Sequence, residues 1–506
     1  MMVDSRTPVI VGVGQVVDRV DTPDYRAMSS VDLAAAAAAA ALEDCGAPRA
    51  GAAVELIAGV RQFEISAPVR APLGKSDNYP RSVALRLGIE PARAVLEVVG
   101  GQGPQKLITE FAGEIAAGRM ESALITGSDA ISTERYWAGR DDKPDFTEVV
   151  GGQLDDRGFG YESFVDENLI RHSVMGAPTQ YALLENARRA RLGLSPADYR
   201  LRMGELFAPF TSVAAKNPLA AVPAERTATE LATITERNRM ICDPFPRLMV
   251  ARDQVNLGAA ALVMSLAKAR ELGVPQDKLV YLRGHADLVE RTLLARPDLG
   301  AAPSGPAAIR EALRVAGIGL GDISHLDLYS CFPIAVSNIC DGLGLAVDDP
   351  RGLTVTGGLP FFGGPGNNYS MHAIAEIVTR MRAEPGAFGL VGANGGILSK
   401  YSAGVYSTEP ADWAPDRGAQ LQRQLDAVPA VPAGRWQADG PASIETYTVR
   451  NAFEPRIGLV IGRLHAGGQR FMARIDADSL SAVDDPLGHD IHVTSSERGN
   501  SAVLAS

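Results

Sequence analysis

The sequence predicts an α/β protein built from two similar halves, with an inserted segment and a small all-β domain near its C-terminal end. Three observations support this fold class. Apolar strands alternate with helices in the first half, the same helix–glycine–strand order returns in the second, and half-buried strands follow residue 443. With 506 residues, 46% apolar and 22% charged, the chain can bury several cores.

The first half is predicted to be a mainly parallel sheet with helices on its faces. Apolar runs that end in glycine predict covered strands, and runs of helix formers that stop at Gly46 and Gly118 predict helices. The alanine-rich stretch at 34–42 is too short to cross a membrane and predicts a closely packed helix. The expected strands are 9–14, 54–60, 94–99, 122–126 and 258–265, and the expected helices are 32–45 and 105–117.

An internal repeat relates the two halves. Residues 33–60 and 306–332 both give a helix, a glycine stop, a loop and an apolar strand, and a glycine-rich turn follows each. We interpret this as a structural duplication, with 1–275 as the N-terminal half and 276–408 as the C-terminal half. Because identity between the segments is low, a chance likeness between two α/β units stays open.

Residues 145–240 interrupt the alternation and predict an inserted loop domain or lid within the first half. The segment has long polar helices and two arginine runs, 188–191 and 237–239. A run of charges usually marks the solvated face of a helix, and we expect that here.

The chain changes character again near its C-terminal end. Residues 409–442 are rich in Pro, Ala, Gln and Asp, which predicts a linker or a loosely packed crossover. Residues 443–506 contain alternating segments without a strong helix, which predicts an OB-like barrel of about five strands. These segments are 445–450, 457–463, 469–475 and 490–494.

Composition narrows the function classes. The formal charge of −11 is unusual for a general nucleic-acid binder. Four cysteines without a C-x-x-C pair give neither a disulfide framework nor a zinc site, so we expect no metal and a reducing, cytoplasmic location. The short apolar run at 9–13 is not the core of a signal peptide, and we expect no membrane association.

A series of motifs falls in a family-specific order and spacing. Together they resemble the thiolase superfamily, and within it the sterol-carrier-protein-type and type 1 thiolase-like branch, over about residues 7–408. The segments are GGQGPQKLI (100–108), ALITGSDAIS (123–132), MGAPTQYALL (175–184), NPLA (217–220), NLGAAALVMS (256–265), DLYSCFPIAV (327–336), GGLPFFGGPGNNYSMHAIAEIV (357–378) and GANGGILSKYSAGVYS (392–407).

The resemblance implies a five-layer αβαβα sandwich of two halves with a loop domain. It also implies that the protein handles acyl groups carried on coenzyme A, as acetyl-CoA acetyltransferases do, and that it acts in lipid metabolism. The resemblance implies no other cofactor. A dimer is the family default, and the additional C-terminal domain makes a monomer the alternative.

The chain departs from this family at the positions that carry the chemistry. Thiolases acylate a cysteine at the mouth of a helix, and the matching residue here is Gly100, or Gly101 if the register slips by one. The activating histidine is replaced by Gly364, and the second, acid/base cysteine is replaced by Ala393. An acyl-enzyme reaction through cysteine therefore has no group to start it, and the small residues predict an open cavity.

Other parts of the family site have counterparts here. Backbone N–H groups near Gly100 and Gly395 could form an oxyanion hole. The resemblance makes Tyr329, Cys331 and Asn394 the candidate catalytic residues, with Cys331 the one cysteine in a family position. The expected substrate-binding residues are Gly100, Gly101, Met175, Gly363, Gly364, Gly395 and Gly396.

Each candidate also has a structural interpretation. Cys331 lies in an apolar run without an adjacent cation, so we expect a buried, unreactive thiol. Tyr329 could be a packed aromatic with one hydrogen bond, and Asn394 could serve a left-handed turn. His372 on the next helix is more often a core histidine than a relocated base.

Three functions stay open at this point. We expect a thiolase-like protein that binds CoA or acyl-CoA and transfers acyl groups, if at all, without a cysteine intermediate. The first alternative is an acyltransferase that uses Cys331 as acid/base. The second is a scaffold that binds a partner or nucleic acid through 443–506, where Arg450, Arg456, Arg463, Arg470 and Arg474 interleave with Phe453 and Phe471 but acidic residues outnumber arginines.

Overall fold

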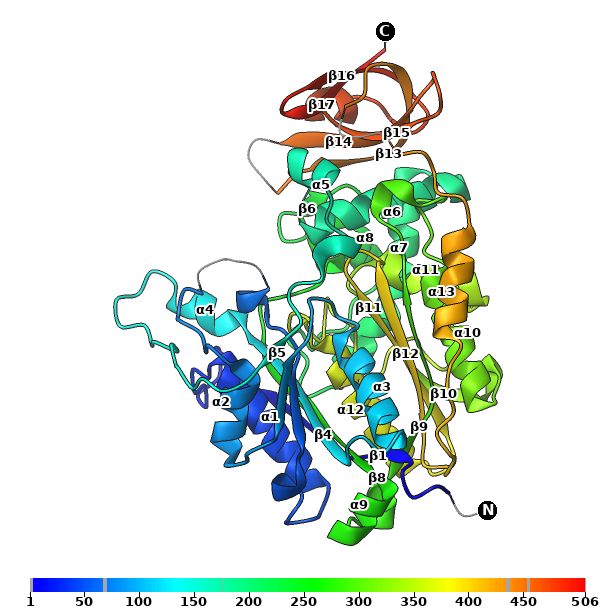
Figure 1. Ribbon diagram of the computed structural model, residues 1–506. Helices are drawn as coiled ribbons and strands as arrows, with labels where there is room; N and C mark the ends of the chain where they lie inside the picture. The colour runs from blue at the N-terminus through cyan, green and yellow to red at the C-terminus, as the bar shows by residue number, and fades with distance from the viewer. Residues whose placement is uncertain (1–2, 67–70, 175, 434–436, 453–455, 506) are drawn as a thin grey trace.

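The computed structural model describes residues 3–66, 71–174, 176–433, 437–452 and 456–505. Two α/β halves lie side by side, and a small barrel sits on one end of them (Figure 1). No helix in these ranges is long and apolar enough to cross a bilayer.

The N-terminal half has the strand order β1-β8-β4-β2-β3, with the short β5 at its edge. Strand β2 runs parallel to β3 and β4, whereas β8 runs antiparallel to β4 and β1. The elements are β1 (Pro8–Val17), α1 (Ser30–Asp44), β2 (Leu56–Gly59), α2 (Tyr79–Leu87), β3 (Arg93–Leu96), α3 (Gly103–Ala116), β4 (Ser122–Ala130), β5 (Asp155–Asp156), β8 (Asn256–Ser265) and α9 (Leu266–Leu272).

The C-terminal half repeats this arrangement in the order β9-β12-β11-β10. Strand β10 is parallel to β11, and β12 is antiparallel to β11 and β9, which confirms the predicted duplication. A short antiparallel pairing of β1 with β9 joins the halves into one ten-stranded sheet. The elements are β9 (Val280–Val289), α10 (Ser304–Ala316), β10 (Ile323–Leu328), α11 (Pro333–Leu343), α12 (Tyr369–Ala383), β11 (Phe388–Gly395) and β12 (Lys400–Ser407).

Helices cover both halves and fill the space between them, giving the expected five layers. Helix α1 packs on β1, β8 and β4, and α10 packs on β9 and β12. Helices α3 and α12 lie in the middle, against strands of both halves (Figure 1). In each half, a glycine in the first strand lets the outer helix pack close to the sheet. A Cβ on Gly12 would lie 2.0 Å from the Ala41 carbonyl oxygen, and a Cβ on Gly284 would lie 1.9 Å from the Ala312 carbonyl oxygen.

The inserted segment supplies helices that lie between the sheets and the barrel (Figure 1). Its longest helices are α6 and α7, which follow the short α5. The elements are α5 (Glu167–Arg171), α6 (Ala177–Leu192), α7 (Pro196–Ala214), α8 (Ala228–Ala232) and β6 (Met240–Cys242), and β7 (Phe245–Pro246) follows. The short helix α4 (Ile131–Trp137) precedes the segment and contacts β8.

The arginine run on α6 is not a solvated face, so that expectation is wrong. The side chains of Arg188 and Arg189 are buried. Arg188 pairs with Asp341 at 2.8 Å and Arg189 pairs with Asp485 at 2.8 Å. The run fixes α6 to α11 on one side and to the barrel on the other, and Arg191 remains near the surface.

The segment from 409 to 442 is more ordered than a linker. It contains α13 (Gly418–Ala427), which packs against β9 and α10. Before this helix, Trp413 stacks on His285 with ring centroids 4.2 Å apart, and Arg417 pairs with the buried Glu311 at 2.9 Å. The expectation of loose packing is therefore wrong up to Ala427.

The C-terminal domain is a closed barrel of five strands, as expected, and none of its strands joins the ten-stranded sheet. Strand β13 nevertheless pairs with β6 of the inserted segment. Asn186 Nδ2 donates to the Tyr447 carbonyl at 2.9 Å, and Thr446 Oγ1 donates to that of Leu183 at 2.6 Å. The elements are β13 (Gly440–Arg450), β14 (Ile457–Leu464), β15 (Arg470–Ile475), α14 (Ala477–Ser481), β16 (Asp490–Ser496) and β17 (Gly499–Leu504).

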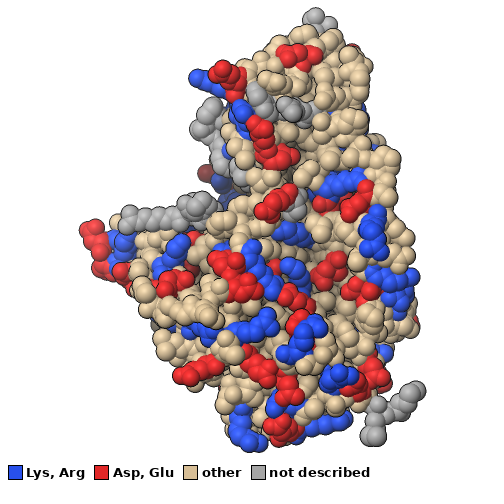
Figure 2. All heavy atoms as spheres, viewed as in Figure 1, with Lys and Arg blue, Asp and Glu red and all other residues tan. Residues whose placement is uncertain are grey.

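The barrel does not present the basic and aromatic surface that the nucleic-acid alternative needs. Phe471 lies in the barrel core, Arg470 is buried against Glu445, and Phe453 lies outside the described residues. On the face shown in Figure 2, basic side chains are interspersed with acidic ones. A stacking platform for single-stranded nucleic acid is therefore absent from the part of the barrel that the structure describes.

Candidate functional site

The glycine-rich turns predicted to form the site come together in the interior. The Gly100 N–H donates to Asn367 Oδ1 at 3.0 Å, and the Tyr329 N–H donates to the Gly392 carbonyl at 2.9 Å. A Cβ placed on Gly395 would lie 3.1 Å from the Cα of Gly100. We call the region bounded by Gly100, Gly101 and Gly395 the glycine centre.

Neighbouring side chains fill the glycine centre, so the expected open cavity is wrong at these positions. The Gln102 Oε1 would lie 2.1 Å from a Cβ on Gly100 and 1.7 Å from one on Gly395. The Tyr329 hydroxyl would lie 2.2 Å from a Cβ on Gly101. The space that a nucleophile's side chain would need is occupied by an amide and a phenol.

The backbone of Gly100 also disfavours a nucleophile. Its φ of 144° lies in a region that side-chain-bearing residues rarely adopt. The Gly100 N–H already donates to the Asn367 side chain, so it is not free to stabilise an oxyanion. The lost cysteine is thus part of a rebuilt turn and not a single replacement.

Gln102 carries a group that needs a partner. The residue is buried, and its Oε1 accepts no hydrogen bond from any described residue. A buried amide oxygen without a donor is costly and marks a place where a ligand or water can donate.

Cys331 lies in a neutral, buried environment. Asn394 Nδ2 lies 3.9 Å from the Cys331 Sγ and donates to the Tyr181 hydroxyl at 2.7 Å. Burial raises the pKa of Cys331 to about 12, and neutral hydrogen bonds from Tyr181 and Asn394 only partly oppose it. The thiol is therefore buried, as expected, and stays protonated near neutral pH.

The other two candidate catalytic residues, Asn394 and Tyr329, are buried, and their catalytic roles stay predictions. Asn394 is extended in β11 opposite Tyr401, so the left-handed turn is wrong, and its Oδ1 has no partner among the described residues. Tyr329 packs edge-on against Tyr369 with ring centroids 5.3 Å apart. Burial raises the Tyr329 pKa well above its usual range, and no described residue hydrogen-bonds its hydroxyl.

The turn at 363–364 leaves little room for a histidine. The Gly364 N–H donates to the Arg252 carbonyl at 2.8 Å, and a Cβ on Gly364 would lie 3.1 Å from Leu359 Cδ2. Ala393, at the second cysteine position, is fully buried. The three family catalytic positions are thus closely packed small residues.

His372 is not a relocated base. It is buried on α12, with Nδ1 2.7 Å from Gln15 Oε1. Burial lowers its pKa to about 3, so the ring stays neutral. The interpretation as a core histidine is the one that the geometry favours, although its Nε2 has no partner in the described ranges.

Gly396, which was expected to line the substrate site, directly follows Gly395 at the edge of the glycine centre. Gly396 has a φ of 61°, and its carbonyl accepts from the Tyr181 hydroxyl at 2.9 Å. A Cβ there would lie 2.8 Å from Phe164. Met175 lies outside the described residues.

Three residues of this region were missed from the sequence. Gln102 and Tyr181 stand within motifs that we quoted, but nothing in a single sequence marks them as neighbours across the fold. The third is Lys400, whose Nζ donates to the carbonyls of Val99 at 3.1 Å and Gly160 at 2.6 Å. Burial lowers the pKa of Lys400 to about 8.

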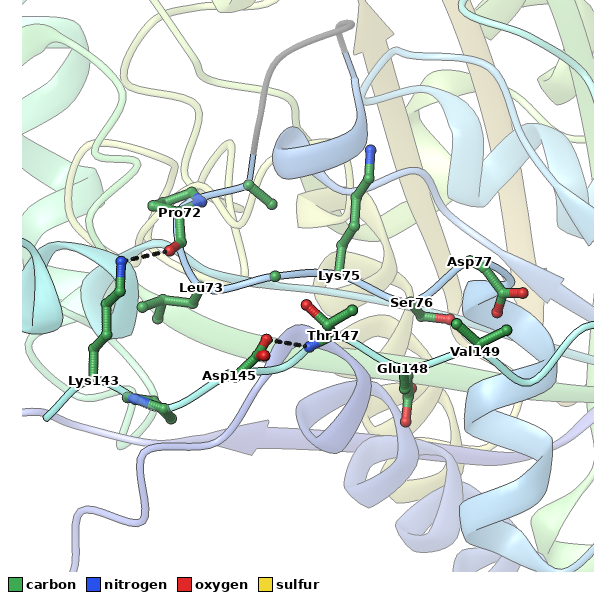
Figure 3. A pocket seen from close by; sticks show the side chains of 13 residues that line it. Pro72, Leu73, Lys75, Ser76, Asp77, Lys143, Asp145, Thr147, Glu148 and Val149 are labelled. Carbon is green, nitrogen blue, oxygen red and sulfur yellow. Dashed lines mark hydrogen bonds between the residues drawn. The ribbon is translucent and has the colours of Figure 1, made fainter.

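A surface groove lies elsewhere, between 71–77 and 143–149, and has a volume of about 590 Å³ (Figure 3). Its lysines, Lys75 and Lys143, are balanced by Asp77, Asp145 and Glu148. It shares no lining residue with the glycine centre. Within the described ranges, no group of three or more His, Cys, Asp or Glu residues could hold a metal ion.

Known proteins resemble the chain over different lengths. The family model described as "Thiolase-like protein type 1 additional C-terminal domain" matches residues 420–498. The dimeric peroxisomal thiolase of Saccharomyces cerevisiae is 15% identical, with 80% of this chain and 98% of that chain covered and a TM-score of 0.58. The Ltp2-ChsH2(DUF35) aldolase is 19% identical, with 79% and 98% covered and a TM-score of 0.58. Both show the fold. No curated protein matches the chain.

One solved structure is similar over the whole length. It is a monomeric SCP2-thiolase-like protein type 1 from Mycobacterium smegmatis, 56% identical, with 99% of this chain and 100% of that chain covered and a TM-score of 0.86. Together with the five-layer core and the additional barrel, this identity shows that the chain belongs to the SCP2-thiolase-like type 1 branch of the thiolase superfamily.

Proposed function

We propose that this protein binds CoA or an acyl-CoA with the thioester end directed at the glycine centre, and that it is not a competent thiolase. The observation that carries the proposal is the set Gly100, Gly364 and Ala393 at the three family catalytic positions. Because these groups act as a unit in such enzymes, losing all three removes the acyl-enzyme route.

Two buried carboxamides support ligand binding at this place. The Oε1 of Gln102 and the Oδ1 of Asn394 have no donor among the described residues. The pantetheine arm of CoA carries amide N–H groups that could donate to such oxygens. If acyl transfer occurs, an acceptor attacks the thioester carbonyl directly and CoA leaves as the thiol with the acceptor's proton.

The acyltransferase that uses Cys331 as acid/base is less well supported. A thiol with a pKa of about 12 releases its proton poorly near neutral pH. The scaffold alternative is also weakened, because the barrel uses β13 and Arg470 to bind its own chain.

The test is calorimetry with CoA on the full chain, combined with a thiolysis assay on acetoacetyl-CoA. We expect a heat of binding for CoA and no turnover in the usual enzyme range of about 1–1000 per second. Absence of binding at millimolar CoA would refute the proposal, and turnover in that range would restore a thiolase.

We also propose that the chain is a monomer, because the 56%-identical relative is described as monomeric. Light scattering after size exclusion should give the 53.4 kDa mass of one chain. A mass of two chains would contradict the monomer and support the dimer that is usual in the family.

A further inference from the structure

Arg252 is a half-buried cation without a counter-ion. It lies just before β8, and within the described residues no carboxylate comes within ion-pair distance of its guanidinium. Its Nε is buried and has no acceptor there. Its backbone is fixed, because its carbonyl accepts from Gly364 and its N–H donates to the Leu359 carbonyl at 3.1 Å.

The Arg252 side chain lines a small cavity next to the Gly363–Gly364 turn. The cavity has a volume of about 150 Å³. Its lining includes Ala221, Val255 and Leu257, and all three lie within 4 Å of a Cβ placed on Gly363. The cavity therefore shares a wall with the turn that replaces the family histidine.

Nearby carboxylates are engaged elsewhere or are solvated. Asp18 accepts the backbone N–H groups of Arg26 and Met28, both at 2.9 Å, and Asp253 pairs with Arg135 at 3.1 Å. Asp21, on the cavity rim, is exposed.

The other cation in the cavity lining is not paired with an acid within the described residues. Arg19 lines the cavity and donates to two backbone carbonyls rather than to an acid. Burial, and then the charge of Arg247, lower the pKa of Arg252, and the carboxylates of Asp253 and Asp21 partly oppose this. An unpaired, partly desolvated guanidinium is costly, and an anion placed in this cavity would remove that cost.

We infer that this cavity binds a carboxylate through Arg252 and, given the proposed function, that the carboxylate belongs to the acyl chain of a CoA thioester. A guanidinium binds a carboxylate with two parallel hydrogen bonds. The ligand class is thus an ω-carboxyacyl-CoA.

The size of the cavity favours an acyl-chain carboxylate over the phosphates of CoA as the anion that binds Arg252. About 150 Å³ is the room of about five water molecules, which fits a carboxylate with a few methylenes but not a nucleotide. The diphosphate of CoA is about 13 bonds, or ~16 Å, from its sulfur, whereas an arginine reaches only ~6 Å from its Cα. Since that Cα lies at the Gly364 turn, the acyl end is the nearer source.

The experiment compares binding of succinyl-, glutaryl- and adipyl-CoA with butyryl- and hexanoyl-CoA by calorimetry on the full chain. We expect at least one carboxylated thioester to bind about tenfold more tightly than its neutral counterpart. Arg252→Ala and the size-preserving Arg252→Gln should both abolish this preference and leave CoA affinity unchanged. Arg49→Ala, the same charge change on an exposed residue, should leave the preference intact.

Contrary results are separable. Equal affinity across all chain lengths, or a preference that persists in both Arg252 variants, would overturn the inference while CoA binding stands. Inorganic phosphate that competes as well as free glutarate would assign the cavity to a free anion and overturn the acyl assignment. If CoA does not bind at all, the proposed function fails, and Arg252-dependent binding of free glutarate would still support the carboxylate site.

Discussion

The glycine centre and the junction between α6 and the barrel differ in their side chains: small residues stand at the first, and a buried charged residue stands at the second. At the centre and at the two family positions outside its definition, the side chains that family members use for catalysis are replaced by Gly100, Gly364 and Ala393. At the junction, the buried Arg189 of α6 pairs with Asp485 of the barrel, a partner that a thiolase core without a barrel does not have.

This difference shows that the family fold can be retained while the side chains at its three catalytic positions are replaced. The five-layer core depends on apolar packing and close glycine–helix contacts, and neither needs a catalytic residue. The junction shares one apolar cluster with the core, which contains Leu459 and Met472 of the barrel as well as Leu183 and Leu184 of α6. The barrel is therefore part of the folded unit.

The largest effect is expected from removing the barrel. A chain that ends after Ser407 would expose Leu183 and Leu184, leave Arg189 unpaired and lose α13. We expect an insoluble or non-cooperatively unfolding protein. Soluble expression and a thermal melt would check this, and a soluble, cooperatively melting fragment would contradict it.

The next effect is expected at Arg189. Arg189→Ala leaves a hole in a buried network and frees Asp485, so the free energy of unfolding should fall by ~3 kcal/mol. Arg191→Ala is the matched control, because its pair with Asp298 is exposed and should contribute about 0.5 kcal/mol. Urea unfolding of both variants gives the comparison, and equal losses would show that burial of the run does not matter.

On another face of α6, Glu185 makes the packing against α7 and α11 sensitive to pH. It is buried between the Tyr199 hydroxyl and the Ile334 N–H, and burial raises its pKa from 4.5 to about 7. Between these values the unfolded chain releases the proton and the folded chain keeps it. Its contribution to the free energy of unfolding therefore falls by ~2–3 kcal/mol as pH rises from about 4.5 to about 7.

Glu185→Gln should remove this dependence, so the variant and the parent should differ most in slope over that range. Denaturant unfolding at several pH values is the measurement. Parallel curves would show that Glu185 keeps an ordinary pKa.

Restoring the family residues should not restore the family reaction. We consider a Gly100→Cys, Gly364→His, Ala393→Cys variant. The cysteine at position 100 would clash with the Gln102 side chain, and its φ would cost about 1–3 kcal/mol. We expect lower stability and no thiolysis of acetoacetyl-CoA. Thiolysis by this triple variant would mean that the glycine centre is still shaped for a nucleophile.

The sequence predicted well what local signals determine. Gly46 and Gly118 end helices with positive φ, and Ser29 caps α1 with Asp32, so the main elements were found. The barrel strands followed from their alternation. The burial of Arg188 and Arg189 could not be foreseen, because their partners lie 153 and 296 residues away along the chain.

The centre was predictable only in part. The resemblance identified which positions lack catalytic groups, because motif order fixes the register. It gave no sign that Gln102 and Tyr329 fill the vacated space, since that depends on side-chain directions across separate turns.

The most direct test of the central claim is the intact mass of the native protein after incubation with acetyl-CoA. The account predicts an unchanged mass, although CoA binds, because no thiolate is available at Gly100 and Cys331 stays protonated. A stable gain of one acetyl group, mapped to Cys331 and prevented by Cys331→Ala, would contradict the account.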